Sequence, residues 1–367
     1  MSAPVPRPGI LEISPYVGGK STLAGVERVI KLASNESALG PSPRAVEAYR
    51  EASGRLHRYP DGGADALRAA LGEAHGLDPA RLVCGSGSDE LLDLLARAYA
   101  GPGDEVLYSA HGFLMYPIVA LSVGATPVAA PERERVADVD ALLGALTPRT
   151  RLVYLANPNN PTGTYLAADE LARLHRGLPG DVLLVVDAAY AEFVEAADYS
   201  VGFDLVEAGE NVVLTRTFSK IHGLAALRLG WVYGPAAVIE VIHRIRGPFN
   251  VTAPAQAAGL AALSDTDWLK AARRHNTTWR EWFSERLREL GFEVPPSVCN
   301  FVLVEFPDEP GRDAATANAF LQARGIIARD VSGYGLANIL RVSIGTEPEM
   351  RAAAEVFAAF REHADGD

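Results

Sequence analysis

Lys220 is the residue whose type and position most directly suggest chemistry. It follows an apolar, strand-like run at 212–214, stands directly after Ser219, and precedes Arg228 by eight residues. A lysine that is partly desolvated beside a buried strand can have a lowered pKa and act as an amine nucleophile. Considered alone, Lys220 is equally well explained as a solvated loop lysine whose charged end reaches water. To choose between these two interpretations of Lys220, we consider the residues at the ends of the neighbouring predicted strands.

Two other apolar runs also end in polar side chains. Asp187 closes the run at 182–186, and Tyr190 follows three residues later. A carboxylate at the end of a buried strand needs a cation or hydrogen bonds, although a helix N-cap is the plain alternative. The segment NPNNPTG at 157–163 contains Asn160 and reads either as a turn cluster or as a ligand-binding loop. Ligands of open α/β sheets bind beyond the carboxyl ends of the strands.

The segment GSGSDE at 85–90 connects a predicted strand to a predicted helix that begins near Ser88 and Asp89. Free N–H groups and the helix dipole make such a helix start an anion site. The competing interpretation is an ordinary strand–helix turn with a Ser or Asp N-cap. Glu90 stands where a third glycine of GxGxxG would be, and the Gly-Lys-Ser/Thr of a Walker loop is absent.

The four segments are more informative together than singly, because strand ends of one sheet can converge. They supply an anion-binding helix start, an amide, an aspartate, and a lysine with a nearby serine and arginine. An acid for a cationic ring nitrogen, an amine able to form a Schiff base, and several phosphate donors describe a site for pyridoxal 5'-phosphate.

The elements that must position these groups read as an α/β fold. Between about residues 80 and 235, short Val- and Leu-rich runs alternate with helical patterns. The runs lack clean alternation, as expected of strands buried on both faces in a mostly parallel central sheet flanked by helices. The later part, with a long helical pattern at 267–290, reads as a smaller α+β unit.

We therefore predict three parts. They are residues 1–45, an N-terminal arm and part of the small domain; 46–255, a large cofactor-binding domain; and 256–367, a small C-terminal domain. The arm shows little regular pattern, so it either joins the smaller unit or wraps a partner.

Composition excludes several classes of protein. The net charge of −12 argues against nucleic-acid or anionic-membrane binding, but not against a small anionic ligand in a local basic pocket. Two cysteines in 367 residues make no disulfide framework, and neither HExxH nor CxxC is present, so we expect no metal. With no signal-peptide pattern and no apolar run of membrane length, we expect a soluble cytoplasmic protein.

Several motifs in this order resemble the fold-type I aminotransferases, which depend on pyridoxal phosphate. These are RYPDG (58–62), GSGSDE, NPNNPTG, DAAY (187–190) and TFSKIHGLAALRLGW (217–231). The segments KLASNESALGPSP (31–43), NFVLVEF (300–306) and GYGLANILRVSIGT (333–346) are similar to the histidinol-phosphate aminotransferase subfamily. The resemblance covers nearly the whole chain. It implies transamination between histidinol phosphate and 2-oxoglutarate, in histidine biosynthesis.

The resemblance also assigns roles by position. It implies that Lys220 binds the cofactor covalently, that Asp187 pairs with the ring nitrogen, and that Tyr190 and Asn160 form hydrogen bonds with the ring 3-oxygen. It also implies that Phe113 and Ala189 pack on the two ring faces, and that the cofactor phosphate is held by Ser88, Asp89, Ser219 and Arg228 and, from a neighbouring subunit, by Tyr59. The residues that it places in the substrate pocket are Tyr16, Asn35, Arg329 and Arg341. The implied assembly is a homodimer with shared active sites.

Three departures from the subfamily pattern leave the catalytic groups in place. Ala188 stands where the family often has Glu, Ser37-Ala38 replace a common Asn-Pro, and Gly18 replaces a Pro. The last two lie in the substrate-facing arm, so they bear on substrate choice rather than on chemistry. A Phe or Tyr aminotransferase is the alternative within the family, and a decarboxylase or a cofactor-binding regulator without turnover are others.

Overall fold

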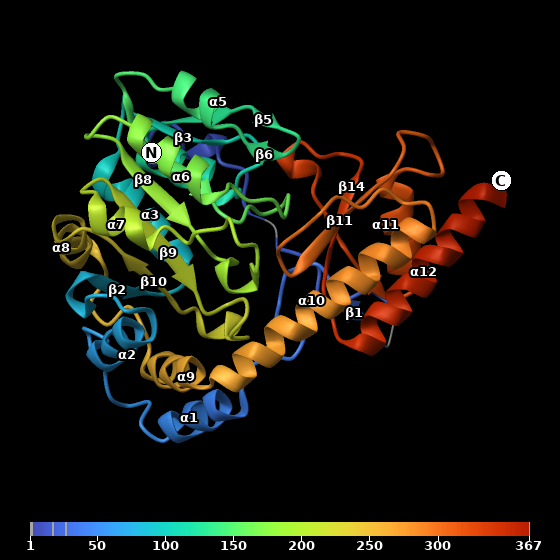
Figure 1. Cartoon of the computed structure of the whole chain (residues 1–367), viewed down its shortest axis with the longest axis horizontal. Helices are drawn as coiled ribbons and strands as arrows, with labels where there is room; N and C mark the ends of the chain where they lie inside the picture. Colours follow the sequence, from blue (N-terminus) through green and yellow to red (C-terminus); the bar gives the residue numbers. More distant parts are fainter. Residues whose placement is uncertain (1–2, 17, 26–27, 367) are drawn as a thin grey trace.

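A seven-stranded sheet forms the centre of the larger part of the molecule (Figure 1). The computed structural model describes residues 3–16, 18–25 and 28–366. In spatial order the strands are β2 (Leu82–Gly85), β10 (Gly230–Tyr233), β9 (Val212–Thr217), β8 (Leu183–Asp187), β7 (Thr150–Ala156), β3 (Glu105–Ser109) and β4 (Thr126–Ala130). Strand β10 is antiparallel to both neighbours and the other pairs are parallel. The predicted mostly parallel α/β sheet is confirmed.

Helices cover both faces of this sheet. Successive residues of β8 alternate between two separate cores, with Val185 in one and Leu184 and Val186 in the other. Because both faces are buried, the strands show no polar alternation. One face is covered by α3 (Ser88–Tyr99), α4 (Met115–Val123) and α8 (Ala236–Ile245). The other is covered by α2 (Asp65–His75), α5 (Val139–Gly144), α6 (Ala168–Gly177), α7 (Phe203–Ala208) and α9 (Ala253–Ser264).

The smaller part of the molecule has its own core. Its elements are α10 (Thr266–Glu289), β11 (Phe301–Glu305), α11 (Ala314–Ala323), β12 (Ile326–Ile327), β13 (Arg329–Asp330), β14 (Ile339–Ser343) and α12 (Glu347–Gly366). Strand β1 (Ile30–Lys31) pairs with β12, and Ile30 lies in this core. The stretch around β1 therefore joins the smaller unit, one of the two expected arrangements, whereas Arg7 near the start of the chain donates a hydrogen bond to the Ser122 carbonyl oxygen in helix α4 of the larger part. The predicted domain limits at residues 45 and 255 stay predictions.

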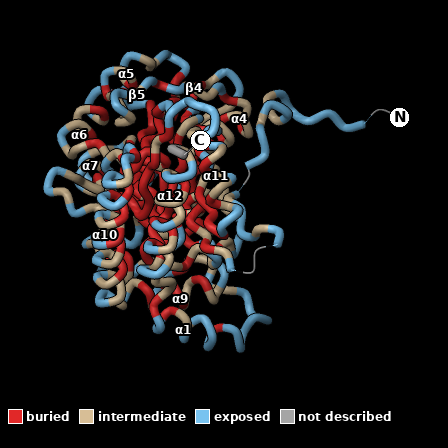
Figure 2. The backbone as a smooth tube through the Cα atoms, turned by 90° about the vertical axis from the view of Figure 1, so that its right-hand side faces the viewer, coloured by how far each residue is buried: buried red, intermediate tan, exposed pale blue. Residues whose placement is uncertain are grey.

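The remaining elements are short or peripheral. They are α1 (Pro43–Ser53), β5 (Glu132–Arg133), β6 (Val136–Ala137) and 3-10 helices at Ile10–Glu12, Pro79–Arg81, Ala191–Phe193, Ala225–Leu227 and Ser332–Tyr334. Residues 3–8 are exposed and extend away from the buried centre of the molecule (Figure 2). Among the described helices, none has the length and apolar character that a membrane span requires.

Candidate active site

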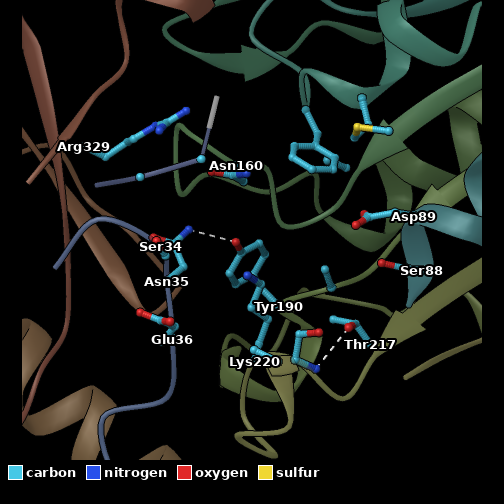
Figure 3. A pocket seen from close by; sticks show the side chains of 18 of the residues that line it. Ser34, Asn35, Glu36, Ser88, Asp89, Asn160, Tyr190, Thr217, Lys220 and Arg329 are labelled. Carbon is cyan, nitrogen blue, oxygen red and sulfur yellow. Dashed lines mark hydrogen bonds between the residues drawn. The ribbon is translucent and has the colours of Figure 1, made fainter. Parts of the chain in front are cut away.

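One cavity of about 390 Å³ brings together almost all the residues predicted from the sequence. They come from the carboxyl ends of the central strands, from the N-terminal segment and from the smaller unit (Figure 3). The predicted residues that line it are Tyr16, Asn35, Ser88, Asp89, Phe113, Asn160, Asp187, Ala189, Tyr190, Ser219, Lys220, Arg228, Arg329 and Arg341. This convergence follows from the sheet, because strand ends meet along one edge.

Asp187 is a buried acid with neutral hydrogen-bond donors. Its carboxylate accepts hydrogen bonds from the Tyr116 hydroxyl at 3.0 Å and from the Thr215 hydroxyl at 3.1 Å. Burial raises the pKa of Asp187 to about 6. A buried carboxylate held by two neutral hydroxyls is stabilised further by a cation, so this end of the cavity suits a protonated ring nitrogen.

Burial shifts the pKa values of both Lys220 and Tyr190. Burial, together with the positive charges of Arg341 and Arg228, lowers the pKa of Lys220 to about 8. Its ammonium nitrogen lies 5.5 Å from the centre of the Tyr190 ring. Burial raises the pKa of Tyr190, and its hydroxyl oxygen accepts a hydrogen bond from Asn35 Nδ2 at 2.9 Å. Lys220 is half-buried and lines the cavity, which favours the sheltered lysine over the solvated one.

The opposite end of the cavity is built for an anion. Helix α3 begins after Gly87, which has a φ of 85° and provides no side-chain cap for the first N–H groups. A Cβ at Gly87 would lie 2.5 Å from Arg228 Nη2, so only glycine lets this guanidinium approach the helix start. Arg228 also donates to the Ser219 hydroxyl at 3.4 Å and pairs with Asp89 at 3.0 Å. Hydroxyl, guanidinium and helix N–H groups together suit a phosphate.

Arg341 lines the cavity from strand β14 of the smaller unit. It is 5% exposed and donates hydrogen bonds to Asn160 Oδ1 and to the Ala33 carbonyl oxygen. Its buried Nε has no hydrogen-bond partner among the described residues. Arg329 is its register partner between β13 and β14, and the Arg329 guanidinium lies 6.0 Å from the centre of the Tyr16 ring.

Tyr59 is the one predicted site residue that does not line the cavity. Its side chain is 83% exposed and stacks on Phe249, with ring centres 4.7 Å apart. Its predicted contact with a neighbouring subunit's site stays a prediction. Sequence reasoning also missed cavity and supporting residues, including Tyr116, Thr215, Thr217, Lys31 and Glu36. Thr215 could have been found only from the register of β8 and β9, in which it stands opposite Asp187.

A buried charged cluster connects the chain segments that carry Tyr190 and Lys220. Glu192 pairs with Arg216 at 2.6 Å and lies 4.0 Å from His222 Nε2, and all three are largely buried. Glu192 follows Tyr190 by two residues, and His222 follows Lys220 by two. Burial alone would raise the pKa of Glu192, but the charges of Arg216 and His222 hold it below its ordinary value. The cluster therefore depends on the Arg216 charge.

We expect Arg216→Met to destabilise the folded protein by about 3–5 kcal/mol at pH 8, because Glu192 loses its buried counter-ion. Burial then raises the pKa of Glu192 above its unfolded value, so the variant loses stability as pH rises and approaches the parent at pH 5. Urea unfolding at both pH values measures this. Arg244→Met, which removes an exposed pair with Glu240, is the control and should cost under about 1 kcal/mol. An Arg216→Met loss that small would contradict the account.

Comparisons with known proteins identify the family of this chain. The family model for class I and II aminotransferases matches residues 27–357. Histidinol-phosphate aminotransferases from Paramagnetospirillum magneticum and Rhodospirillum centenum are 60% and 59% identical, covering 99% and 97% of this chain and 99% and 98% of their own lengths.

Solved structures of aminotransferases share the fold of this chain. The crystal structure of histidinol-phosphate aminotransferase from Sinorhizobium meliloti in complex with pyridoxal-5'-phosphate superposes with a TM-score of 0.87 at 29% identity, covering 96% of each chain. A double mutant of Thermus thermophilus aspartate aminotransferase has a TM-score of 0.81 at 26% identity, covering 91% of this chain and 92% of its own. The chain therefore belongs to the class I and II aminotransferases and, within them, to the histidinol-phosphate aminotransferase family.

Proposed function

We propose that the protein transfers the amine of histidinol phosphate to 2-oxoglutarate, giving imidazole acetol phosphate and glutamate, with pyridoxal 5'-phosphate as cofactor. The convergence of Lys220, Asp187 and Arg228 in one cavity carries this proposal. The names of the relatives support the substrate assignment over a Phe or Tyr aminotransferase. The buried, unpaired Cys84 and Cys299 fit a reducing compartment, and we place the reaction in the cytoplasm.

The residues present fit the cofactor. Ser219, Arg228 and the first N–H groups of α3 would hold its phosphate. Asp187 would face the ring nitrogen, and Phe113 and Ala189 belong to the same lining. When bound, the cofactor supplies an electron sink for the negative charge that develops at the substrate α-carbon.

The side chains then have distinct tasks. Because burial lowers its pKa, Lys220 has a larger unprotonated fraction near neutral pH than a solvated lysine, and it can remove the α-proton and return it at a second carbon. The charge of Asp187 favours a protonated ring nitrogen, and Tyr116 and Thr215 hold its carboxylate in place. The Tyr190 phenol, kept protonated by burial, is a hydrogen-bond donor.

Arg341 suits both half-reactions. Histidinol phosphate carries a phosphate where glutamate carries its α-carboxylate, and one guanidinium binds either anion in bidentate fashion.

Adding glutamate to the cofactor-loaded protein tests the reaction class. We expect the visible absorbance band of the bound cofactor to bleach, with stoichiometric 2-oxoglutarate and no carbon dioxide. Release of carbon dioxide would identify a decarboxylase, and an unchanged spectrum with no product would identify a binding protein without turnover.

We also propose a homodimer whose two sites share residues, and we expect subunit mixing to restore activity. Tyr59 is exposed and lies outside its own chain's cavity, and the extended arm at 3–8 would be ordered by a partner. In a heterodimer of Lys220→Ala and Tyr59→Phe chains, one site carries both defects and the other neither.

Activity of the mixture should therefore rise above that of either parent, measured after verified subunit exchange. Mixing Lys220→Ala with Lys220→Ala is the matched control. Verified heterodimers without a rise, or full activity of a monomer in sedimentation, would mean that Tyr59 serves its own chain.

A further inference from the structure

One short stretch, residues 110–116, leads from β3 into α4 and supplies two groups that matter for the proposed cofactor, on which this inference rests. Phe113 belongs to the cavity lining. Tyr116 donates a hydrogen bond to Asp187, the proposed partner of the ring nitrogen. The placement of this stretch therefore affects both the lining of the ring site and the support of its acid.

Glu132, in β5, anchors the start of this stretch. Its Oε1 accepts hydrogen bonds from the Ser109 hydroxyl and, at 3.1 Å, from the His111 backbone N–H. Its Oε2 lies 2.7 Å from His111 Nδ1, and the Glu132 side chain is only 2% exposed. Burial would raise the pKa of Glu132, but the hydrogen bonds from His111 and Ser109 hold it below its ordinary value. The carboxylate therefore keeps its charge and uses both oxygens on this one stretch.

The anchored stretch makes a tight turn. The Gly112 N–H donates a hydrogen bond to the Ser109 carbonyl oxygen at 2.7 Å. A Cβ at Gly112 would lie 2.9 Å from that oxygen and 3.2 Å from the Tyr116 ring, so glycine is the residue that fits. Phe113 follows directly, and its placement therefore depends on the contacts that hold Ser109 and His111.

The same anchor reaches a second loop of the site. The buried Asn159 donates a hydrogen bond from its Nδ2 to the His111 carbonyl oxygen at 3.1 Å. The next residue, Asn160, lines the cavity and accepts a hydrogen bond from Arg341. The backbone of His111 thus connects Glu132 to the loop that carries Asn160.

The β5–β6 hairpin that carries Glu132 has an unfavourable turn. Its two turn residues, Glu134 and Arg135, have φ values of 51° and 63°, whereas such turns favour Asn and Gly. Arg135 pairs with Glu305 of β11 through two contacts, at 2.5 and 2.9 Å, and its carbonyl oxygen accepts from the Thr164 hydroxyl at 2.7 Å. The hairpin therefore lies between the two parts of the molecule (Figure 1) and is held from both. Strained residues persist where their surroundings fix them, commonly beside active sites.

We propose that Glu132 is a positioning residue for the cofactor. It fixes the stretch that carries Phe113 and Tyr116. Through the backbone of His111 it also fixes the loop that carries Asn160. Neither Glu132 nor His111 belongs to the described lining of the cavity, so Glu132 acts through these other residues.

Two substitutions test the proposal in a graded way. Glu132→Ala removes all three contacts, whereas Glu132→Gln keeps a carbonyl oxygen as acceptor and loses the charge. In the cofactor-free protein, we expect hydrogen–deuterium exchange of peptides covering 109–116 and 157–164 to become at least about 10-fold faster in Glu132→Ala, since the buried charge-assisted hydrogen bonds are lost. Glu132→Gln should lie between the parent and Glu132→Ala, at about 3-fold or more.

The cofactor-loaded variants provide a second, spectroscopic measurement. We expect the circular dichroism of the visible cofactor band to weaken in Glu132→Ala, because the ring is held less firmly. The limiting rate of the glutamate half-reaction should fall about 10-fold or more, since small misplacements of reacting groups slow the chemical step. The glutamate concentration that gives half this rate should stay within about 3-fold of the parent value.

Glu134→Gln removes an exposed acid from the same hairpin and is the matched control, expected to leave exchange, dichroism and rate unchanged. A purely structural role for Glu132 would lower the urea midpoint while exchange in the two loops, the cofactor dichroism and the limiting rate of the folded variants stayed at parent values. That result would overturn the proposal. If Glu132→Ala does not fold, Glu132→Gln decides by the same measurements, and changes under about 3-fold would overturn the proposal.

The cofactor-free measurement separates this inference from the proposed function. A parent protein that binds no pyridoxal 5'-phosphate would overturn the proposed function. The exchange rates of the two loops in the cofactor-free variants would still decide whether Glu132 fixes them.

Discussion

Lys220→Ala is expected to lower kcat by at least about 10⁴-fold, because the variant loses both a covalent attachment and the group that moves the substrate proton. Cofactor binding should persist, since Ser219, Arg228 and the start of helix α3 remain in place at the phosphate end. Loss of turnover with retained binding is the signature that separates a catalytic lysine from a structural one.

Single-turnover assays and equilibrium dialysis of pyridoxal 5'-phosphate measure the two parts of this prediction. Lys270→Ala, on the exposed surface of helix α10, is the matched control and should leave both unchanged. An active Lys220→Ala protein that still forms a borohydride-reducible bond to the cofactor would show that another amine serves in its place.

Asp187→Asn is expected to slow the glutamate half-reaction by at least about 100-fold, and by far more than Asn160→Ala. The substitution keeps the shape and removes the negative charge that stabilises a cationic ring nitrogen. Breaking a buried charge pair costs about 3–5 kcal/mol, and each 1.36 kcal/mol of barrier is tenfold in rate. Asn160 contributes a neutral amide, whose loss costs about tenfold.

Because Asn160 also accepts a hydrogen bond from Arg341, its replacement should appear partly in KM. Pre-steady-state rates at saturating glutamate remove that contribution and isolate the chemical step. Comparable losses in the two variants under those conditions would mean that Asp187 does not control the protonation of the ring.

The fold was predictable where hydrophobic runs are long and bounded by turn residues. The runs that became β7, β8 and β9 are buried on both faces, so their lack of alternation correctly indicated a covered parallel sheet. The predicted helix start at Ser88 is also the start of α3. The direction of strand β10 was not predictable, because the segment LGWVYG carries no sign that this strand runs antiparallel to both neighbours.

Site residues at strand ends could be predicted from the sequence, whereas those that only tertiary packing brings to the site could not. Asp187, Asn160 and Lys220 each follow an apolar run, and their convergence in one cavity follows from sheet geometry. Tyr116 lies within helix α4, and its contact with Asp187 spans 71 residues. The Glu192–Arg216 pair likewise depends on tertiary packing, because a buried arginine inside a strand carries no local signal in the sequence.

The most direct test of the central claim is a comparison of kcat/KM for histidinol phosphate, Phe and Tyr with 2-oxoglutarate as acceptor. With Arg341 as the shared anion site and Arg329 as a further cation beside it in the lining, we expect histidinol phosphate to exceed Phe and Tyr by at least about 100-fold. Equal or higher values for Phe or Tyr would contradict the account and identify an aromatic amino acid aminotransferase.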